Sequence, residues 1–388
     1  MLPARPVLTD AVKVLHVIDS LGRGGAEQVL VTLLPELNRQ GVATVVVVRG
    51  GAMDLAPVLS AAGVRVRQLA RRHRWNLPLA AREIAGIARA EAADIVHAHL
   101  YFPAVTVALM RWWRMSPART CVTFHNLAYA GANASTPGLW VRRRLARWLY
   151  PRGFDRMFGV SQAVVAHYQQ ALGLKQLMVL HNAVPVLALQ QAGQVAKVQQ
   201  PPGTDLTVVL PGRIVPEKGH ADLVAALRIL DAKIPRLRAV VAGDGPLRRD
   251  VEAMVSQAGL ADQVEFTGAL DHAAMIRTVA TADIVVVPSR HEGFGLTALE
   301  AMALGRAVVA TTVGGLPEVM GDTGVLVPPV DPEALAAAID RLAQDPGLRK
   351  AMGDRAAARA RAEFDIGAVT GRLKAAYQAL LSPDRPPD

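Results

Sequence analysis

The sequence predicts an α/β protein with two domains, each a parallel β-sheet covered by helices. Short apolar runs rich in β-branched residues alternate with stretches of helical periodicity, a pattern typical of parallel sheets. The pattern starts again after a polar, proline-containing stretch near residue 200. A chain of 388 residues is long enough to build two hydrophobic cores. In such sheets ligands bind beyond the carboxyl ends of the strands, so the residues that follow each strand are the candidates for function.

Composition and charge narrow the classes of partner. With 51% hydrophobic and 20% charged residues, the chain is expected to be compact rather than disordered. Its net charge of +10 and its pI of about 10.2 favour phosphorylated substrates or an anionic membrane surface. Nucleic acid is not an expected partner, because only 4% of the residues are aromatic and they do not interleave with basic tracts outside one helix.

The single cysteine and the first twenty residues of the sequence favour a cytoplasmic location for the protein. The single cysteine, Cys121, allows no disulfide within the chain and argues against a metal cluster, which fits a reducing compartment. Residues 1–20 lack the basic-then-apolar layout of a signal peptide. The apolar run Val45–Val48 is far shorter than the ~20 residues of a membrane-spanning helix. We therefore expect a cytoplasmic protein, attached at most to the inner face of the cell membrane.

The first half of the chain contains seven predicted strands separated by helices. Helices are predicted at Ala26–Gln40, Leu79–Ala90 and Ser161–Leu172. Pro35 should kink the first of them, because proline lacks the amide that the helix ladder needs. The predicted strands are Lys13–Ile18, Thr44–Arg49, Val64–Leu69, Asp94–Ala98, Thr120–Phe124, Arg156–Val160 and Met178–Leu180.

A glycine-rich loop, residues 21–27, follows the first strand. Its Gly22-x-Gly-Gly turn does not match the dinucleotide fingerprint, because Glu27 stands where the third glycine belongs and no acidic residue ends the next strand. The sequence therefore argues against an NAD-dependent oxidoreductase. The loop is either a ligand-facing turn or a tight turn without a ligand.

Three histidines lie at the ends of predicted strands. His97 lies near the end of the fourth strand, His99 comes just after that strand, and His125 follows the fifth. A single histidine in such a place is often structural, but the carboxyl ends of parallel strands share one edge, so we expect these three to converge. His97 lies deeper in its strand and is therefore expected to be buried in the packing of the sheet, whereas His99 has just left the strand.

A basic, tryptophan-containing helix is predicted at Leu139–Tyr150. Apolar residues lie on one side of it and arginines elsewhere, a pattern that suits an anionic membrane surface. The pattern fits equally an ordinary helix that packs on the sheet and exposes a solvated basic face. As a hypothesis, the helix brings the protein to a lipid-linked substrate through Trp140, Arg142, Arg143 and Arg147.

Composition also places the domain boundaries. The first domain is predicted to span residues 1–185. Residues 186–204 are rich in glutamine and end in Pro201-Pro-Gly203, so they are predicted to be a linker. The second domain is predicted at residues 205–365, and residues 366–388 contain a last helix.

The second domain starts with a strand at Thr207–Leu210 and a loop that carries two cations. Arg213 and Lys218 leave this strand together and precede a helix, where they would neutralise a diphosphate. Arginine supplies a bidentate fork and lysine a movable point charge. Further strands are predicted at Leu237–Ala242, Val264–Thr267, Ile284–Val287, Ala307–Thr311 and Gly324–Val327, and further helices at Pro332–Ala343, Leu348–Glu363 and Ile366–Leu381.

A strand, a glycine-rich turn and a helix form the most informative unit of the chain. The turn contains Gly293 and Gly295, which let the backbone come close to a ligand, and the first amides of the following helix favour an anion such as phosphate. Glu292 and Glu300 flank this turn. Ionised carboxylates accept hydrogen bonds from sugar hydroxyls, so the unit predicts a nucleotide-sugar site.

The string Ser-x-x-Glu-Gly-Phe-Gly-Leu-x-x-Leu-Glu-Ala-Met, residues 289–302, resembles the signature of the retaining glycosyltransferases of family 4. The turn Gly24-Gly-Ala-Glu27, the loop Gly212-Arg-x4-Lys-Gly219, and the turns Gly243-x-Gly-Pro246 and Gly314–Glu318 are similar to other motifs of that family. The resemblance implies the GT-B fold: two Rossmann-like domains that face each other across a cleft, with the last helix crossing back to the first domain.

The resemblance also implies an activity and a set of site residues. The expected reaction moves a sugar from a nucleoside-diphosphate sugar to a hydroxyl acceptor with retention of configuration, in bacterial surface-polysaccharide synthesis on a glycan or lipid-linked acceptor. No cofactor and no metal are expected, and no Asp-x-Asp motif occurs in the chain. The implied catalytic residues are His99, Arg213, Lys218 and Glu292; the donor-binding residues are Gly25, Gly243, Gly293, Phe294, Gly295, Leu296, Thr297 and Glu300; and the acceptor-side residues are Gly24 and His125.

Two alternatives stay open at this point. A nucleotide-sugar epimerase with the same fold would consume the donor without an acceptor. A catalytically idle nucleotide-sugar-binding protein would act as a scaffold in a polysaccharide assembly complex. The presence of every motif residue argues against an idle protein.

Overall fold

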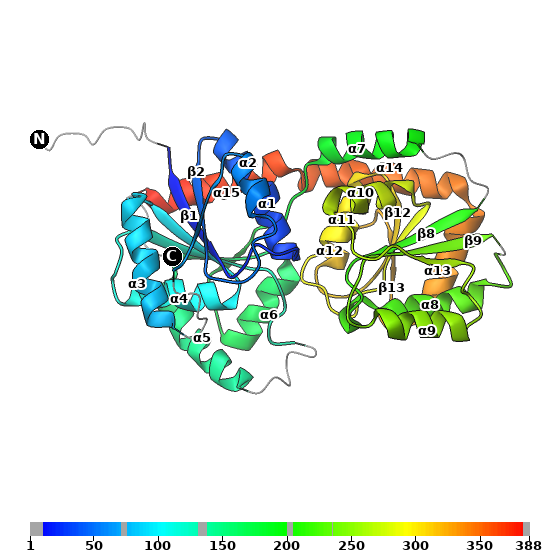
Figure 1. Ribbon diagram of the computed structural model, residues 1–388, viewed down its shortest axis with the longest axis horizontal. Helices are drawn as coiled ribbons and strands as arrows, with labels where there is room; N and C mark the ends of the chain where they lie inside the picture. Colours follow the sequence, from blue (N-terminus) through cyan, green and yellow to red (C-terminus); the bar gives the residue numbers. More distant parts are fainter. Residues whose placement is uncertain (1–10, 71–75, 131–137, 200–204, 235, 383–388) are drawn as a thin grey trace, which may run out of the picture. The chain divides into compact units, whose positions relative to one another are not determined.

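The chain folds into two compact α/β units. The computed structural model describes residues 11–70, 76–130, 138–199, 205–234 and 236–382. The first unit contains Met1–Ala183 and Ile366–Asp388, and the second contains Val184–Asp365. In each unit helices cover a parallel sheet, so the predicted fold class is confirmed (Figure 1).

The first unit is built on a seven-stranded sheet in the order β3-β2-β1-β4-β5-β6-β7. Every neighbouring pair is parallel, and the central strands have almost no exposed residues, as is usual for sheets covered on both faces. The strands are β1 (Lys13–Ile18), β2 (Ala43–Val48), β3 (Arg65–Gln68), β4 (Ile95–His99), β5 (Arg119–Phe124), β6 (Arg156–Gly159) and β7 (Leu177–Val179).

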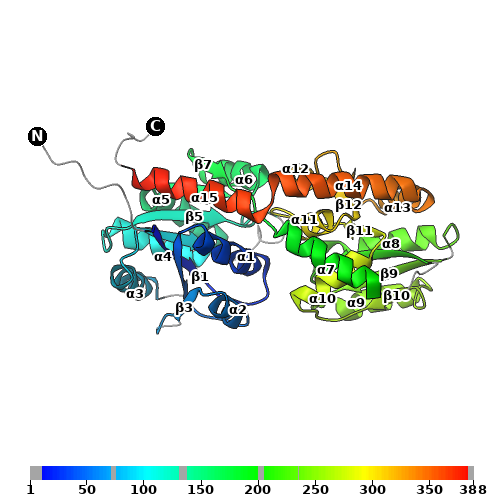
Figure 2. The same ribbon diagram turned by 90° about the horizontal axis from the view of Figure 1, so that it is seen from above.

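The helices of the first unit include the last helix of the chain, α15, which packs against α1 (Figure 2). Gln40, at the end of α1, donates a hydrogen bond of 2.6 Å to Thr370 Oγ1 and accepts one of 2.6 Å from Lys374. The helix α1 continues through Pro35. The helices are α1 (Gly25–Arg39), α2 (Ala56–Ala61), α3 (Leu77–Ala90), α4 (Tyr101–Trp112), α5 (Leu139–Gly153), α6 (Gln162–Leu172) and α15 (Ile366–Leu381).

The second unit has a six-stranded parallel sheet in the order β10-β9-β8-β11-β12-β13. Its strands are β8 (Leu206–Pro211), β9 (Leu237–Ala242), β10 (Val264–Phe266), β11 (Ile284–Val287), β12 (Ala307–Thr311) and β13 (Val325–Val327). Its helices are α7 (Val186–Gln199), α8 (His220–Leu230), α9 (Arg248–Gln257), α10 (His272–Thr281), α11 (Leu296–Ala303), α12 (Leu316–Met320), α13 (Pro332–Gln344) and α14 (Pro346–Glu363), with a short 3₁₀ helix at Pro216–Lys218.

The segment predicted as a linker is mostly a helix, so that prediction is corrected. Residues 186–199 form α7, which packs against α10 and α11 of the second unit. Glutamine, alanine and leucine favour helix formation, and Val186, Leu189 and Ala196 are buried on one side of it. Gly193 lies close to the end of the Leu304 side chain, which would have to shift to admit a larger residue. The rest of the predicted linker, residues 200–204, lies outside the described residues.

Candidate active site

In both sheets the order in which strands are added reverses at one point, and ligands bind at such points in proteins of this architecture. The chain leaves β8 toward β9 and β10 on one side and later returns to form β11 to β13 on the other. In such sheets the loops that follow the two strands at this point, here β8 and β11, are the usual place for a ligand. The predicted loops with Arg213 and Lys218 and with Glu292 and Gly295 follow these two strands. The same switch in the first unit lies between β1 and β4.

Lys218 and Glu292 meet across the switch point of the second unit. Lys218 Nζ lies 2.7 Å from Glu292 Oε2, and both side chains are partly buried. Lys218 ends the 3₁₀ helix after β8, whereas Glu292 lies in the turn after β11. The two loops that the sequence singled out separately thus form one charged site. Arg213, on the same loop as Lys218, is exposed.

Glycines allow the backbones of these loops to pack directly against each other, because they have no Cβ. Gly219 has φ of +69°, and a Cβ added to it would overlap the carbonyl oxygen of Pro288 at the end of β11. A Cβ on Gly314 would likewise overlap the carbonyl oxygen of Glu292. Gly243 contacts the carbonyl oxygen of Gly212 in the same way. The need for close packing, not only the approach of a ligand, therefore explains the glycines of these motifs.

The turn after β11 is held by Arg290. Its guanidinium forms a bidentate pair with Asp222 in the first turn of α8, at 2.8 and 3.1 Å. Its backbone amide donates to the carbonyl oxygen of Glu217 at 2.8 Å. Through Arg290 these contacts join the β11 loop to the β8 loop and to the start of α8, and they hold in place the backbone that carries Lys218 and Glu292.

The start of α11 supplies backbone donors beside Glu292. Gly295 has φ of +106° and precedes the helix, whose first i-to-i−4 hydrogen bond runs from the Leu299 amide to the Gly295 carbonyl at 3.0 Å. The amides of Leu296 and Thr297 therefore come before the helix ladder and favour an anion. The side chain of Phe294 is buried against Phe364, with ring centroids 5.9 Å apart, so it offers no ring to a ligand.

Glu300, within α11, has a partner that the sequence analysis missed. His272 Nε2 lies 2.8 Å from Glu300 Oε1, and this hydrogen bond raises the pKa of His272. His272 begins α10 directly after Asp271, which caps that helix. Its position at a helix start after β10, on the carboxyl edge, is the signal that could have found it. This hydrogen bond uses the Oε1 atom of Glu300 and not the Oε2 atom.

A second missed residue, His220, follows the cation loop. It is buried, and neither ring nitrogen has a hydrogen-bond partner among the described residues. Burial, together with the nearby charge of Lys218, lowers the pKa of His220 to about 4. His220 is therefore neutral at neutral pH and can donate one hydrogen bond and accept another at the start of α8.

The first unit has a pocket of about 470 Å³ at the carboxyl ends of β1 and β2. Asp19 and Arg49 each come directly after their strand and pair at 2.9 Å on its wall. Phe102 contributes an aromatic ring and lies 5.8 Å from the Arg49 guanidinium. The predicted residues Gly24 and Gly25 lie at the start of α1, where the Glu27 carboxylate folds back and accepts a hydrogen bond of 2.8 Å from Ser20.

The histidines of β1 and β4 form a buried hydrogen-bonded chain. His16 Nδ1 and His99 Nε2 are 3.0 Å apart, and His99 Nδ1 and His125 Nε2 are 3.1 Å apart. His97 is bonded separately to the Tyr377 hydroxyl at 2.6 Å and to Thr123 Oγ1 at 2.8 Å. Burial lowers the pKa of all four imidazoles, to about 3 for His16 and about 4 for His125.

The hydrogen bonds between the histidines correct the expected exposure of His99. The strand β4 includes His99, which is 4% exposed and has both ring nitrogens occupied by other histidines. His125 is the outermost member and is partly exposed. Convergence of the histidines was predicted correctly, but His99 is buried and His125 is the partly exposed member of the group.

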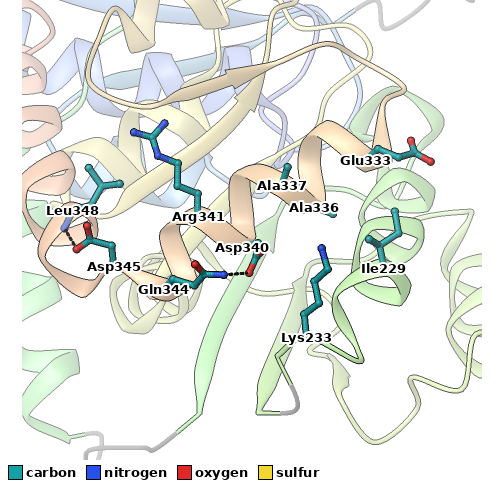
Figure 3. A pocket seen from close by; sticks show the side chains of 10 residues that line it. All are labelled: Ile229, Lys233, Glu333, Ala336, Ala337, Asp340, Arg341, Gln344, Asp345 and Leu348. Atoms are coloured by element: carbon teal, nitrogen blue, oxygen red, sulfur yellow. Dashed lines mark hydrogen bonds between the residues drawn. The ribbon is translucent and has the colours of Figure 1, made fainter.

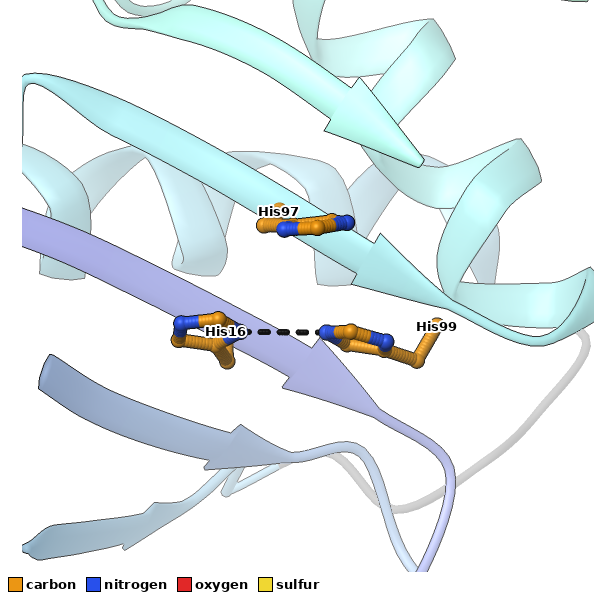
Figure 4. A group of neighbouring side chains, drawn as sticks. All are labelled: His16, His97 and His99. Atoms are coloured by element: carbon orange, nitrogen blue, oxygen red, sulfur yellow. Dashed lines mark hydrogen bonds between the residues drawn. The ribbon is translucent and has the colours of Figure 1, made fainter. Parts of the chain in front are cut away.

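The same histidines do not fit a metal ion in this arrangement. Ring nitrogens of His16, His97 and His99 lie within 4.8 Å of one another (Figure 4). The rings are stacked, however: His97 and His99 have centroids 4.5 Å apart and planes only 25° from parallel. A metal lies near the plane of each imidazole that binds it, along the nitrogen lone pair, so nearly parallel stacked rings cannot aim at one point. Hydrogen bonding and stacking account for the cluster.

Comparison with known proteins places these loops in a family. Residues 23–186 match the model described as Glycosyltransferase Family 4, and residues 194–359 match the model of Glycosyl transferases group 1. A D-inositol 3-phosphate glycosyltransferase from Actinosynnema mirum is 31% identical over 91% of this chain and 92% of its own. The chain belongs to glycosyltransferase family 4. The family resemblance predicted from the motifs is therefore confirmed.

Other glycosyltransferases match over part of the chain or by fold. The alpha-D-kanosaminyltransferase of Streptomyces kanamyceticus is 35% identical over 45% of each chain. The crystal structure of Anabaena HepE in complex with UDP has a TM-score of 0.82 at 21% identity, over 95% of this chain and 100% of that one. A glycosyltransferase from Rickettsia africae has a TM-score of 0.80 at 21% identity, over 96% and 99% of the two chains. At these identities the structures establish the fold.

A separate depression of about 910 Å³ in this glycosyltransferase lies between α8 and α13 (Figure 3). Its wall mixes Lys233 and Arg341 with Glu333 and Asp340. It is located at the end of α8, whereas Lys218 lies just before the start of that helix. The depression is therefore remote from the charged loops, and we assign it no part in the site.

Proposed function

We propose that this family 4 glycosyltransferase moves a sugar from a nucleoside-diphosphate sugar to a hydroxyl acceptor, with retention of configuration and without a divalent metal. The meeting of Lys218, Glu292 and the start of α11 at one switch point carries the proposal. The UDP and UDP-glucose complexes of Anabaena HepE support a nucleotide-sugar donor. In the reaction the bond between the anomeric carbon and the phosphate oxygen breaks, a bond to the acceptor oxygen forms on the same face, and the acceptor proton passes to the leaving phosphate.

Charge develops on the departing diphosphate, and the site contains groups that would stabilise it. Arg213, Lys218 and the amides near Leu296 are positioned on loops that other contacts already hold in place. Preorganised donors of this kind stabilise a transition state without the cost of rearranging during the reaction. Before the donor binds, Glu292 neutralises Lys218. When the donor binds, its phosphate replaces Glu292 as the partner of Lys218, and Glu292 accepts hydrogen bonds from the sugar hydroxyls.

The two carboxylates serve the two ends of the donor in this proposal. Glu292 lies beside the cation that meets the diphosphate, and Glu300 lies one helix turn and more into α11, paired with His272. Glu300 would accept hydrogen bonds from the ribose through Oε2. Gly293, Gly295 and Thr297 would contribute backbone contacts, whereas Phe294 would act only through its backbone because its ring is buried.

The acceptor is proposed to be a glycan, carried on a lipid, in the synthesis of bacterial surface polysaccharide at the cytoplasmic face of the membrane. The pocket of the first unit supports a sugar-like acceptor. Asp19 and Arg49 offer a hydrogen-bond acceptor and donors, and Phe102 offers an apolar ring, a combination that suits a polyhydroxylated molecule. His125 and the turn at Gly24 would contact the same molecule. None of the helices in the described ranges has the length and apolar composition needed to cross a bilayer.

A thermal-shift screen of UDP-, ADP- and GDP-sugars would identify the donor, and turnover with that donor would test the reaction. We expect Lys218→Ala to lower kcat by about a hundred- to a thousandfold, the usual effect of removing one transition-state donor. Glu300→Ala is expected to raise the donor Kd on the order of ten- to a hundredfold, because a hydrogen bond to a charged group is lost. Lys233→Ala removes an exposed lysine beyond the end of α8 and is the matched control.

The outcomes separate the alternatives. Consumption of the donor without an acceptor would identify an epimerase, and binding without any turnover would identify an idle scaffold. An unchanged donor Kd in Glu300→Ala would contradict the ribose assignment. NMR of the product should show the anomeric configuration of the donor, and EDTA should leave the rate unchanged; an inverted product or an EDTA-sensitive rate would refute those parts of the proposal.

A further inference from the structure

One stretch of the first unit concentrates positive charge and exposed tryptophan. Residues 95–154 contain eight arginines and no aspartate or glutamate, and they include four of the five tryptophans of the chain. The stretch forms β4, α4, β5 and α5, and the two helices pack against each other. Asp155, the first acidic residue after it, is already paired with Arg111 and Arg119. The surface of these helices is therefore strongly basic.

The tryptophans gather where the end of α4 meets α5. Trp112 contacts Trp148 edge to face with centroids 4.9 Å apart, and Trp113 lies 6.0 Å from Trp112. Arg152 lies over the Trp148 ring at 5.3 Å. The four tryptophans, including Trp140, are between 40% and 68% exposed. Large aromatic side chains in such a group are rarely left in water by a soluble protein without a partner.

The helix α5 separates a buried side from an exposed side. Ala146, Leu149 and Gly153 recur at spacings of three and four residues and are buried. Trp140, Arg144 and Arg147, with the same spacings, are exposed on the opposite side, next to Trp148. The outward side of α5 therefore combines indole rings with exposed guanidinium groups.

Two of the arginines that the sequence singled out are used within the protein. The Arg142 guanidinium lies 5.7 Å from the Tyr101 ring and 5.5 Å from the Phe102 ring. Arg143 donates a hydrogen bond of 2.7 Å to the carbonyl oxygen of Ala171. Arg144 and Arg114, which the sequence analysis did not name, are exposed. The exposed face thus differs in its arginines from the one predicted.

We propose that this face, made of Trp112, Trp113, Arg114, Trp140, Arg144, Arg147 and Trp148, binds the surface of an anionic lipid bilayer. Tryptophan rings favour the headgroup region, where the ring is buried and the indole N–H stays hydrated. Arginines beside them interact with anionic headgroups. A nucleic acid would need stacking on unpaired rings along a groove, whereas here the rings stand among cations on the outside of two helices. The inference does not depend on the proposed reaction, because it concerns binding alone.

Vesicle flotation of the full chain tests it. We expect recovery with vesicles in which phosphatidylglycerol replaces a third of the phosphatidylcholine, weak recovery with phosphatidylcholine alone, and loss of binding in high salt. Arg144→Ala combined with Arg147→Ala should lower the partition coefficient about 25-fold, since each arginine near an anionic surface contributes about fivefold. Trp140→Ala should also reduce recovery. A blue shift of tryptophan emission on adding anionic vesicles would place the indoles at the interface.

Matched control variants show whether a loss of binding comes from this face or from any loss of charge or apolar surface. Arg355→Ala with Arg361→Ala removes two exposed arginines from α14, and Leu187→Ala removes an exposed apolar residue from α7; both should float like the wild type. Melting temperatures show whether each variant is folded. Equal recovery with neutral and anionic vesicles would overturn the proposal, as would equal losses in the test and control pairs. Retention on a heparin or DNA column without any vesicle binding would overturn it in favour of a polyanion site.

Discussion

Replacing Gly219 by alanine should separate the two loops that form the charged site. Gly219 has φ of +69°, which alanine adopts with strain of about 1–2 kcal/mol. Its new Cβ would also overlap the carbonyl oxygen of Pro288, a backbone atom that cannot rotate away. Forcing extra volume into a packed site costs a further 1–3 kcal/mol, roughly. We therefore expect about 2–5 kcal/mol of destabilisation of the second unit.

Gly259 provides the matched control for this prediction. It has φ of +74°, but an added Cβ meets nothing within 4 Å. Gly259→Ala should therefore show the backbone strain alone, and the difference between the two variants isolates the contact with Pro288. For a domain of this size each kcal/mol lowers Tm by about 2–4 °C.

Thermal unfolding and donor titration together measure both effects. Gly219→Ala should melt several degrees below Gly259→Ala and should bind the donor more weakly, because the β8 and β11 loops carry Lys218 and Glu292. Equal melting temperatures of the two variants would refute the packing argument. A lower Tm with unchanged donor affinity would show that the loops separate without disturbing the site.

Three further predictions concern single contacts. The hydrogen bond to Glu300 raises the pKa of His272, so that pair stabilises the protein fully below pH 6.5 and loses its effect as pH rises through the raised pKa. The difference in unfolding free energy between wild type and His272→Asn should therefore shrink from pH 5.5 to 8.5. A difference that stays constant with pH would contradict this prediction. Tyr377→Phe leaves His97 Nδ1 without its partner and should cost about 1–3 kcal/mol in urea unfolding, with Tyr377→Leu costing more through lost packing. Cys121 is buried and burial raises the pKa of its thiol, so an aromatic disulfide reagent should label it only in urea; rapid labelling of the native protein would show local opening.

Local patterns were sufficient to predict the strands and the loops that follow them. Most of the β-strands are short apolar runs, and the residues of the candidate site lie in the loops and helices that follow them. Lys218 and Glu292 are 74 residues apart, and their proximity follows from the order of strands in the sheet, which a single sequence does not encode locally. For the same reason the sequence analysis missed the pairing of Glu300 with His272.

The incorrect predictions share a physical cause. Polar composition suggested a linker at residues 186–204, but an apolar stripe of Val186, Leu189 and Ala196 docks the helix α7 on the second unit. His99 was predicted to lie just beyond its strand, yet β4 includes it and two other histidines pack on its ring. In each case a tertiary neighbour decides the exposure of a residue, and its identity depends on distant parts of the chain.

The return of α15 to the first unit has a consequence for how the protein is made. Tyr377 is fully buried there and bonds to His97, so that core is incomplete until residues 366–381 have been synthesised. The second unit, by contrast, is one continuous segment, 184–365. On the ribosome the later segment can therefore reach its native state before the earlier one, and the amino-terminal half must wait, with an apolar groove uncovered, for the last helix to emerge. Shielding by a chaperone during that interval, or slow translation of residues 366–381, would be expected to influence the yield of folded protein.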